Sequence, residues 1–243
     1  MSIFSEVPLT VPVMAKRTYQ TFTHHEAVLH ICCDAFDAVT AEIVRQRKIL
    51  EAYIARHPAF GTSFEPIDLL PAAPEVARRM ARAARLVGVG PMAAVAGTMA
   101  QLAAEAGLNC GAAEAIVDNG GDIYLRASSP AIIALHTGTK GLADRLAFSL
   151  QPADTPVALC SSSGKMGHST SLGQCDLATV VARDASLADA AATRAANLVR
   201  TVDDVDSALE SIMEIEGIDG LMIVKDDRVG LAGHLPALVK THE

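Results

Sequence analysis

Hydrophobic and polar residues alternate near the start of the chain and then recur at helical spacing. In residues 17–34, β-branched, aromatic and apolar side chains take alternate positions on both sides of polar residues 24–26, which is typical of a β-hairpin. In residues 35–57 the apolar side chains stand three or four positions apart, or in multiples of this, and predict a helix that Pro58 ends. Residues 59–73 are rich in Pro, Gly and Ser and are expected to form a loop.

The rest of the chain predicts further helices and mostly short strands. Helices are expected at 74–87, 91–107, 187–199 and 205–214, and strand-like runs at 115–125, 131–135, 157–160, 177–182, 221–224 and 229–232. Proline near the start and glycine past the end of a segment, as in 91–107, are typical of helix boundaries. Short connections without helices indicate antiparallel pairing. The order of strands, helices, strands, helices and strands predicts an α+β fold.

Composition and charge exclude several classes of protein. The 243 residues carry 20 basic and 28 acidic side chains, a net charge of −8, with no basic block, which argues against a nucleic-acid partner or an anionic membrane surface. The chain is long enough for one large domain, 1–243, or for two pseudo-repeated subdomains whose boundary composition does not fix. Five cysteines without CxxC spacing, no export signal and no apolar run of membrane-span length predict a cytoplasmic protein.

Two polar motifs interrupt strand-like runs. Asn119-Gly120-Gly121-Asp122 carries the strongest signal for a two-residue hairpin turn, but a glycine bulge that admits a ligand fits the apolar continuation equally well. Ser161-Ser162-Ser163-Gly164 ends an apolar run and is either a polar turn or a donor of hydrogen bonds to phosphate. It is not a Walker A loop, because the first glycine and the final Ser/Thr of that motif are missing.

Two further segments offer an anion site and a metal site. Gly88-Val89-Gly90 precedes a helix, where backbone N–H groups favour an anion; the alternative is a structural turn between helices, and a Rossmann fingerprint is excluded because no strand precedes it. Asp189 and Thr193 are four positions apart in a predicted helix and therefore share one face. Their hard oxygens suit Mg²⁺. The alternative is that Asp189 is a surface residue and that Thr193 has no functional role.

A third group of polar residues near the N-terminus does not form a metal motif. His24, His25, His30, Cys32 and Cys33 fit no common zinc spacing, so we expect no zinc there.

Taken in order, these motifs resemble the ApbE family of FAD:protein FMN transferases. The resemblance rests on Asn119-Gly-Gly-Asp-Ile, the Ser161–Gly164 turn, a following His and the Ala188-Asp-Ala-x-x-Thr193 helix, and covers residues 85–200. It implies a tunnelling-fold-like α+β domain with a duplicated strand-helix-strand core, a mostly antiparallel sheet and packed helices. It also implies that Asp189 and Thr193 are the metal ligands.

The resemblance implies a flavin or other nucleotide diphosphate ligand, Mg²⁺ as cofactor, and FAD as ligand or as donor of FMN to a Ser/Thr of a protein acceptor. His168 is the candidate acid or base, with Asp189 in the catalytic group. Two positions depart from the family: a Lys-Gly pair is replaced by Ala96-Gly97, and a long His-containing segment is reduced to 168–173. A smaller nucleotide or metabolite is therefore expected to fit better than FAD. The alternatives are a binding module that keeps the fold without the chemistry, and a scaffold that acts through a homodimer interface.

Overall fold

The computed structural model describes residues 17–136, 146–164 and 173–240. An eight-stranded sheet forms its centre, with the order β1-β2-β3-β4-β7-β8-β9-β10 and antiparallel pairing throughout. Its strands are β1 (Gln20–His24), β2 (Ala27–Cys33), β3 (Ala115–Asn119), β4 (Asp122–Arg126), β7 (Val157–Ser162), β8 (Leu177–Ala182), β9 (Ile218–Lys225) and β10 (Arg228–Gly233). The predicted α+β class and antiparallel pairing are confirmed.

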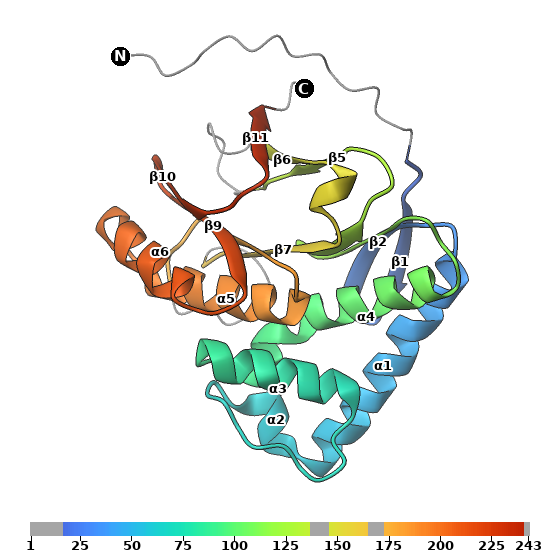
Figure 1. The fold of residues 1–243 in the computed structure, drawn as a ribbon. Coiled ribbons are helices and arrows are strands. Elements are labelled where there is room, and N and C mark those ends of the chain that lie inside the picture. Colours follow the sequence, from blue (N-terminus) through green and yellow to red (C-terminus); the bar gives the residue numbers. More distant parts are fainter. Residues whose placement is uncertain (1–16, 137–145, 165–172, 241–243) are drawn as a thin grey trace.

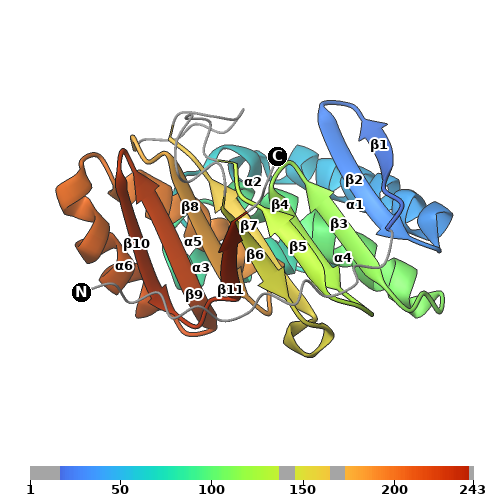
Figure 2. The same ribbon diagram turned by 90° about the horizontal axis from the view of Figure 1, so that it is seen from above.

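Helices cover one face of this sheet and a small sheet covers the other (Figure 1). The helices are α1 (Phe36–Arg56), α2 (Pro58–Thr62), α3 (Glu75–Val87), α4 (Val95–Asn109), α5 (Ala185–Leu198) and α6 (Val205–Met213). The small antiparallel sheet, which lies over the central strands in Figure 2, has the order β11-β6-β5 and consists of β11 (Ala237–Lys240), β6 (Leu146–Leu150) and β5 (Ala131–Ala134).

Four elements differ from the sequence-based expectation. The first residues of the expected loop 59–73 are helical, because Pro58 starts the short helix α2 as well as following the end of α1. The strands β6 and β11 were not predicted; they pair with each other, although more than a third of the chain separates them. The helix expected from residue 91 begins with a 3₁₀ turn, η1 (Pro91–Ala94), before α4.

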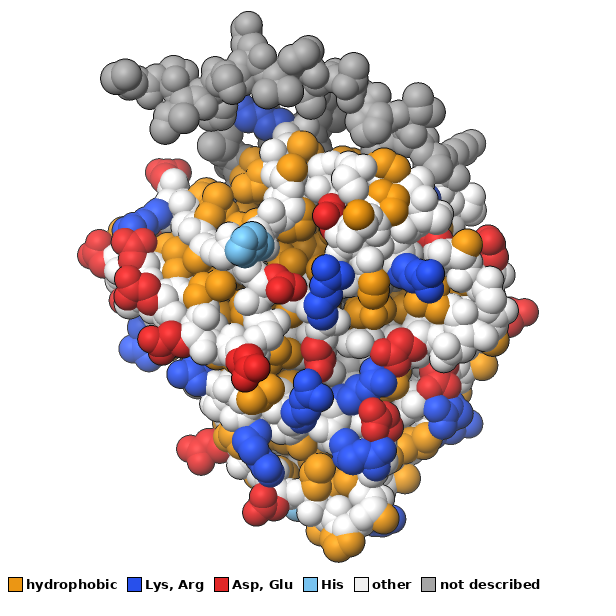
Figure 3. Space-filling view, in the orientation of Figure 1, with side chains coloured by type: hydrophobic (Ala, Val, Ile, Leu, Met, Phe, Trp, Pro, Cys, Tyr) orange, Lys and Arg blue, Asp and Glu red, His pale blue; other side chains and the backbone are white. Residues whose placement is uncertain are grey.

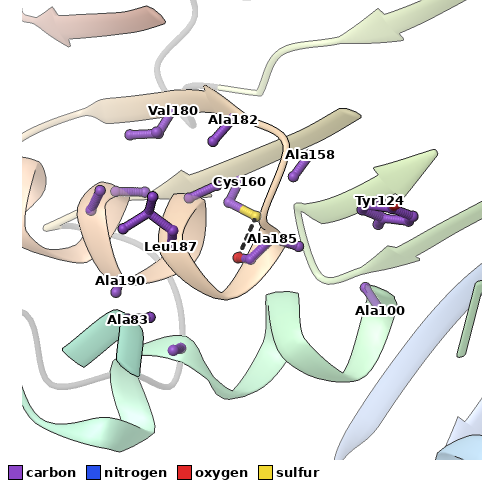
Figure 4. Close-up of a cluster of buried hydrophobic side chains, with 14 of the residues drawn as sticks. Ala83, Ala100, Tyr124, Ala158, Cys160, Val180, Ala182, Ala185, Leu187 and Ala190 are labelled. Carbon is purple, nitrogen blue, oxygen red and sulfur yellow. Dashed lines mark hydrogen bonds between the residues drawn. The ribbon is translucent and has the colours of Figure 1, made fainter. Parts of the chain in front are cut away.

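The alternation of side chains divides the core into two layers. Ala158, Cys160 and Val180 point to the helices, whereas Val157 and Leu159 point to the small sheet. Helix α5 is buried on several sides, and small side chains let it approach the sheet and α4 closely (Figure 4). This layer between the sheet and the helices contains the polar residues of the site.

No single helix in the described ranges is long and apolar enough to cross a membrane. Helix α3 and the η1–α4 segment reach that length and composition only together, across a bend of 106°.

Candidate functional site

The Asn119–Asp122 motif forms the hairpin turn between β3 and β4. Asn119 pairs with Asp122 across the turn, and Gly120 and Gly121 have φ of 71° and 101°, which favour glycine. The N–H of Gly121 donates to Asp118 Oδ1 at 2.8 Å. The structure therefore has the hairpin, not the bulge, of the two alternatives.

Helix α4 begins against this turn and against α5. The Asn119 side-chain amide donates to the carbonyl of Ala96 at 3.1 Å, and the N–H of Gly97 donates to Asp189 Oδ2 at 2.8 Å. A Cβ at Gly97 would lie 2.3 Å from the carbonyl oxygen of Ala185, so only glycine allows this approach of α4 to α5. The Asn119–Asp122 turn, α4 and α5 thus meet at Ala96-Gly97.

Two buried carboxyl groups, Asp122 and Asp189, face the layer between the sheet and α5. Each residue is 8% exposed. Burial raises the pKa of Asp122 well above its usual value, and the charge of Asp189 raises it further. Burial raises the pKa of Asp189 to about 7, against the opposing effect of the Gly97 and Ala96 N–H groups. Ionising both groups together is costly unless a cation lies nearby.

The thiol of Cys160 borders this pair, because Cys160 is the cross-strand partner of Asp122. Its Sγ donates to the carbonyl of Ala185 at 3.6 Å (Figure 4). Burial and then the charges of Asp122 and Asp189 raise the pKa of the Cys160 thiol well above its usual value. A neutral thiol adds no charge, so negative charge at this site arises only when Asp122 or Asp189 ionises.

The donor set around the pair fits Mg²⁺. Asp122 Oδ1 is buried without a hydrogen-bond partner, an open acceptor beside a second carboxylate. Thr193 lies one turn beyond Asp189 on α5 and is partly exposed. Among the described residues, no group of three or more His, Cys, Asp or Glu side chains can hold a metal ion. A bound Mg²⁺ would therefore need hydroxyl, backbone or phosphate oxygens besides the two carboxylates.

The Ser161–Gly164 segment divides between the two faces of the sheet. Ser161 shares a hydrogen bond of 2.9 Å with the hydroxyl of Thr179, on the face of the small sheet. Ser162 pairs with Ala178 and lies on the helix face, two residues beyond Cys160 at the C-terminal end of β7. Buried Ser163 donates to the carbonyl of Cys175 at 3.4 Å, and the N–H of Gly164 donates to the same oxygen at 2.8 Å. Of the three serines, Ser162 therefore shares the face of the carboxyl pair.

The Gly88–Gly90 turn packs against α5 and against the loop after α2. Gly88 ends α3 with φ of 79°, and the Arg194 guanidinium donates to the carbonyl of Val87 beside it. A Cβ at buried Gly90 would overlap the carbonyl oxygen of Ser63. Both glycines thus have a packing role, and anion binding at this turn stays a prediction.

The remaining site prediction, His168, lies outside the described residues, as does most of the 168–173 segment. Sequence analysis missed two residues that shape the site. Gly97 was noted only as part of the Ala96-Gly97 pair, and Cys160 only as one of the five cysteines without CxxC spacing. A glycine inside an apolar helix was the available signal for close helix contact.

The fold is that of flavin transferases. Over 92% of this chain and 98% of the other, it matches a flavin transferase ApbE from Vibrio cholerae with a TM-score of 0.60 and 12% identity. An ApbE protein from Thermotoga maritima matches with a TM-score of 0.54 and 12% identity, over 93% of this chain and 97% of the other. At such identity the likeness concerns the fold alone.

Sequence comparison shows the family. The family model described as AbpE bacteria matches residues 13–219, and the chain belongs to this family. A UPF0280 protein of Archaeoglobus fulgidus is 41% identical over 89% of this chain and 92% of its own length. The UPF0280 protein MJ1526 of Methanocaldococcus jannaschii is 41% identical over 82% of each chain. The resemblance to the ApbE family is thereby confirmed.

Proposed function

We propose that this protein binds a flavin or another nucleotide diphosphate together with Mg²⁺ and transfers FMN from FAD to a Ser or Thr of a protein acceptor. The observation that carries the proposal is the buried pair Asp122 and Asp189, with an open acceptor oxygen on Asp122. The fold shared with flavin transferases supports it.

In this proposal Asp122, Asp189 and Thr193 would hold the metal. When bound, Mg²⁺ would neutralise the charge on the pyrophosphate. Ser162 lies at the C-terminal end of β7, on the face of the carboxyl pair, and would donate a hydrogen bond to a phosphate oxygen, with the Gly88–Gly90 turn as a further candidate.

In the transfer step, the acceptor oxygen would form a bond to the FMN phosphorus while the bond between that phosphorus and the AMP oxygen breaks. The acceptor loses its hydroxyl proton to a base, for which His168 is the candidate, and AMP leaves. Asp189 would act through its charge and its place beside the metal. Cytoplasmic location and a homodimer remain part of this proposal.

A binding module is the second candidate. The Lys-Gly pair that the family resemblance implies is Ala96-Gly97 here, so a cation expected in that position is missing. The carbonyl of Ala96 is instead bonded to Asn119. A module of this kind would bind nucleotide with Mg²⁺ and leave FAD intact.

Mass spectrometry separates the two candidates. The protein is incubated with FAD, Mg²⁺ and a Ser/Thr-containing flavinylation peptide, and the peptide is examined for covalent FMN. Magnesium-dependent FMN addition that is lost in Asp189→Asn supports the transferase. Thermal stabilisation by FAD or ADP with Mg²⁺, without FMN addition or AMP release, supports the binding module. No stabilisation by any nucleotide contradicts both.

A further inference from the structure

The outer edge of β10, the last strand in the order of the eight-stranded sheet, is a second surface of interest besides the Asp122 and Asp189 pair. In the described part of the chain no strand pairs with this edge. The backbone of His234 donates to the carbonyl of Asp219 at 2.6 Å, so hydrogen-bonded pairs with β9 fall at even-numbered residues. The N–H and C=O groups of Val229 and Leu231 therefore point away from β9, toward the open edge.

This edge lacks the features that usually prevent pairing with another strand. Val229 and Leu231 are 38% and 49% exposed, and no Lys or Pro interrupts the strand. The opposite edge strand, β1, carries Gln20, Thr21, Thr23 and His24 instead. The two ends of the same sheet thus differ in how readily they would accept a further strand.

A groove of about 420 Å³ runs between β10 and α6. Leu209, Met213 and Ala232 supply its apolar lining, and Asp206 and Glu210 supply carboxylates. Arg228 pairs with Asp206 at 2.6 Å, whereas no described cation pairs with Glu210. The groove can therefore take an aliphatic side chain that ends in a positive charge.

The surroundings of the groove are strongly acidic. Residues 203–219 contain seven acidic side chains and no Lys, Arg or His: Asp203, Asp204, Asp206, Glu210, Glu214, Glu216 and Asp219. Figure 3 shows acidic side chains gathered around α6, next to apolar surface. Pairing of two β10 edges from two copies would bring these acidic helices together, which disfavours a second copy as the occupant.

We propose that β10 and α6 form a docking site for an extended segment of a partner protein that alternates basic and apolar residues. The segment adds a strand to β10. Its basic side chains lie along Leu209 and Met213 and reach Glu210, and its apolar side chains lie beside Val229 and Leu231 on the other face. The added strand runs antiparallel to β10. In this register its apolar residues stand opposite Val229 and Leu231, and their N–H groups bond to β10.

Blocked, fluorescein-labelled hexapeptides test the proposal on the intact protein by anisotropy. We expect saturable binding of a Lys-Val repeat and none of a Glu-Val repeat. N-methylation of the Val amides should abolish binding, whereas N-methylation of the Lys amides, which point away from β10, should preserve it. Equal binding of both methylated peptides, or binding of the Glu-Val repeat, contradicts strand addition in this register.

A pair of charge reversals locates the site. Glu210→Lys should weaken binding of the Lys-Val repeat on the order of tenfold. Glu65→Lys makes the same change on an exposed loop far from the groove along the chain and should leave the affinity within about twofold. Equal weakening by both variants would mean attraction to the net charge alone and overturns the proposal. So would concentration-dependent dimers that form through β10 and exclude the peptide.

Discussion

The negative charge of Asp189 raises the pKa of Asp122 across the interface between α5 and β4. Both carboxyls are buried, and no described Lys or Arg is among the causes that shift the pKa of either group. The folded protein therefore keeps protons on this pair at a pH where the unfolded chain has lost them. A divalent cation would replace these protons. Protonation of the pair, metal binding and the free energy of unfolding are therefore coupled.

Removing one carboxylate should stabilise the metal-free protein at alkaline pH. The pKa of Asp189 is about 7 in the folded protein and near 4 in the unfolded chain, so the free energy of unfolding falls as pH rises through this window. We expect Asp189→Asn to raise Tm at pH 8 by about 5 °C in the presence of EDTA, and to change it little at pH 4. Thermal scans across pH measure this. A lower Tm at pH 8 would mean that Asp189 is a structural residue.

Thr193 is expected to act only through its hydroxyl. Thr193→Ala should abolish stabilisation by Mg²⁺ with nucleotide and leave the metal-free Tm within about 2 °C, because the side chain is partly exposed. Thr193→Ser keeps the oxygen and should retain most of the stabilisation. Full stabilisation of the Ala variant would remove Thr193 from the metal site.

Ser161 and Ser162 form a matched pair, one residue apart on opposite faces. Ser162→Ala should weaken nucleotide binding several-fold, since its hydroxyl shares the face of Asp122. Ser161→Ala breaks the bond to Thr179 and should cost about 1 kcal/mol of stability without changing nucleotide affinity. Calorimetric titration and urea unfolding measure the two effects, and the reverse assignment would show that Ser161 faces the ligand.

Gly97 should tolerate no side chain. In Gly97→Ala the new Cβ meets the Ala185 carbonyl, so we expect a loss of about 1–3 kcal/mol and weaker Mg²⁺ binding as α4 moves from Asp189. Gly61→Ala is the control, because its Cβ meets only the Ile54 side chain. Equal stabilities of the two variants by urea unfolding would show that α4 and α5 adjust freely.

The sequence predicted those helices and strands whose formation depends on residues close together in the chain. The helices and hairpins were found because periodicity and turn residues act over short distances. The pairing of β6 with β11 depends on segments far apart, and neither strand has a strong local pattern.

The site shows the same limit. Asp122, Asp189 and Ser162 were each identified, but which serine faces the carboxylates depends on strand register, where a shift of one residue reverses the face. The contact of Gly97 with Ala185 depends on how two helices pack, which composition does not fix.

In the proposed function, the pair Asp122 and Asp189 binds a nucleotide diphosphate through Mg²⁺. Calorimetric titration of FAD and ADP into the protein, with Mg²⁺ and with EDTA, tests it most directly, with Asp189→Asn as the matched variant. We expect saturable binding with Mg²⁺, tighter for ADP than for FAD, and loss of affinity on the order of a hundredfold in EDTA or in Asp189→Asn. Binding that is equal with and without Mg²⁺, or unchanged in Asp189→Asn, would contradict the account.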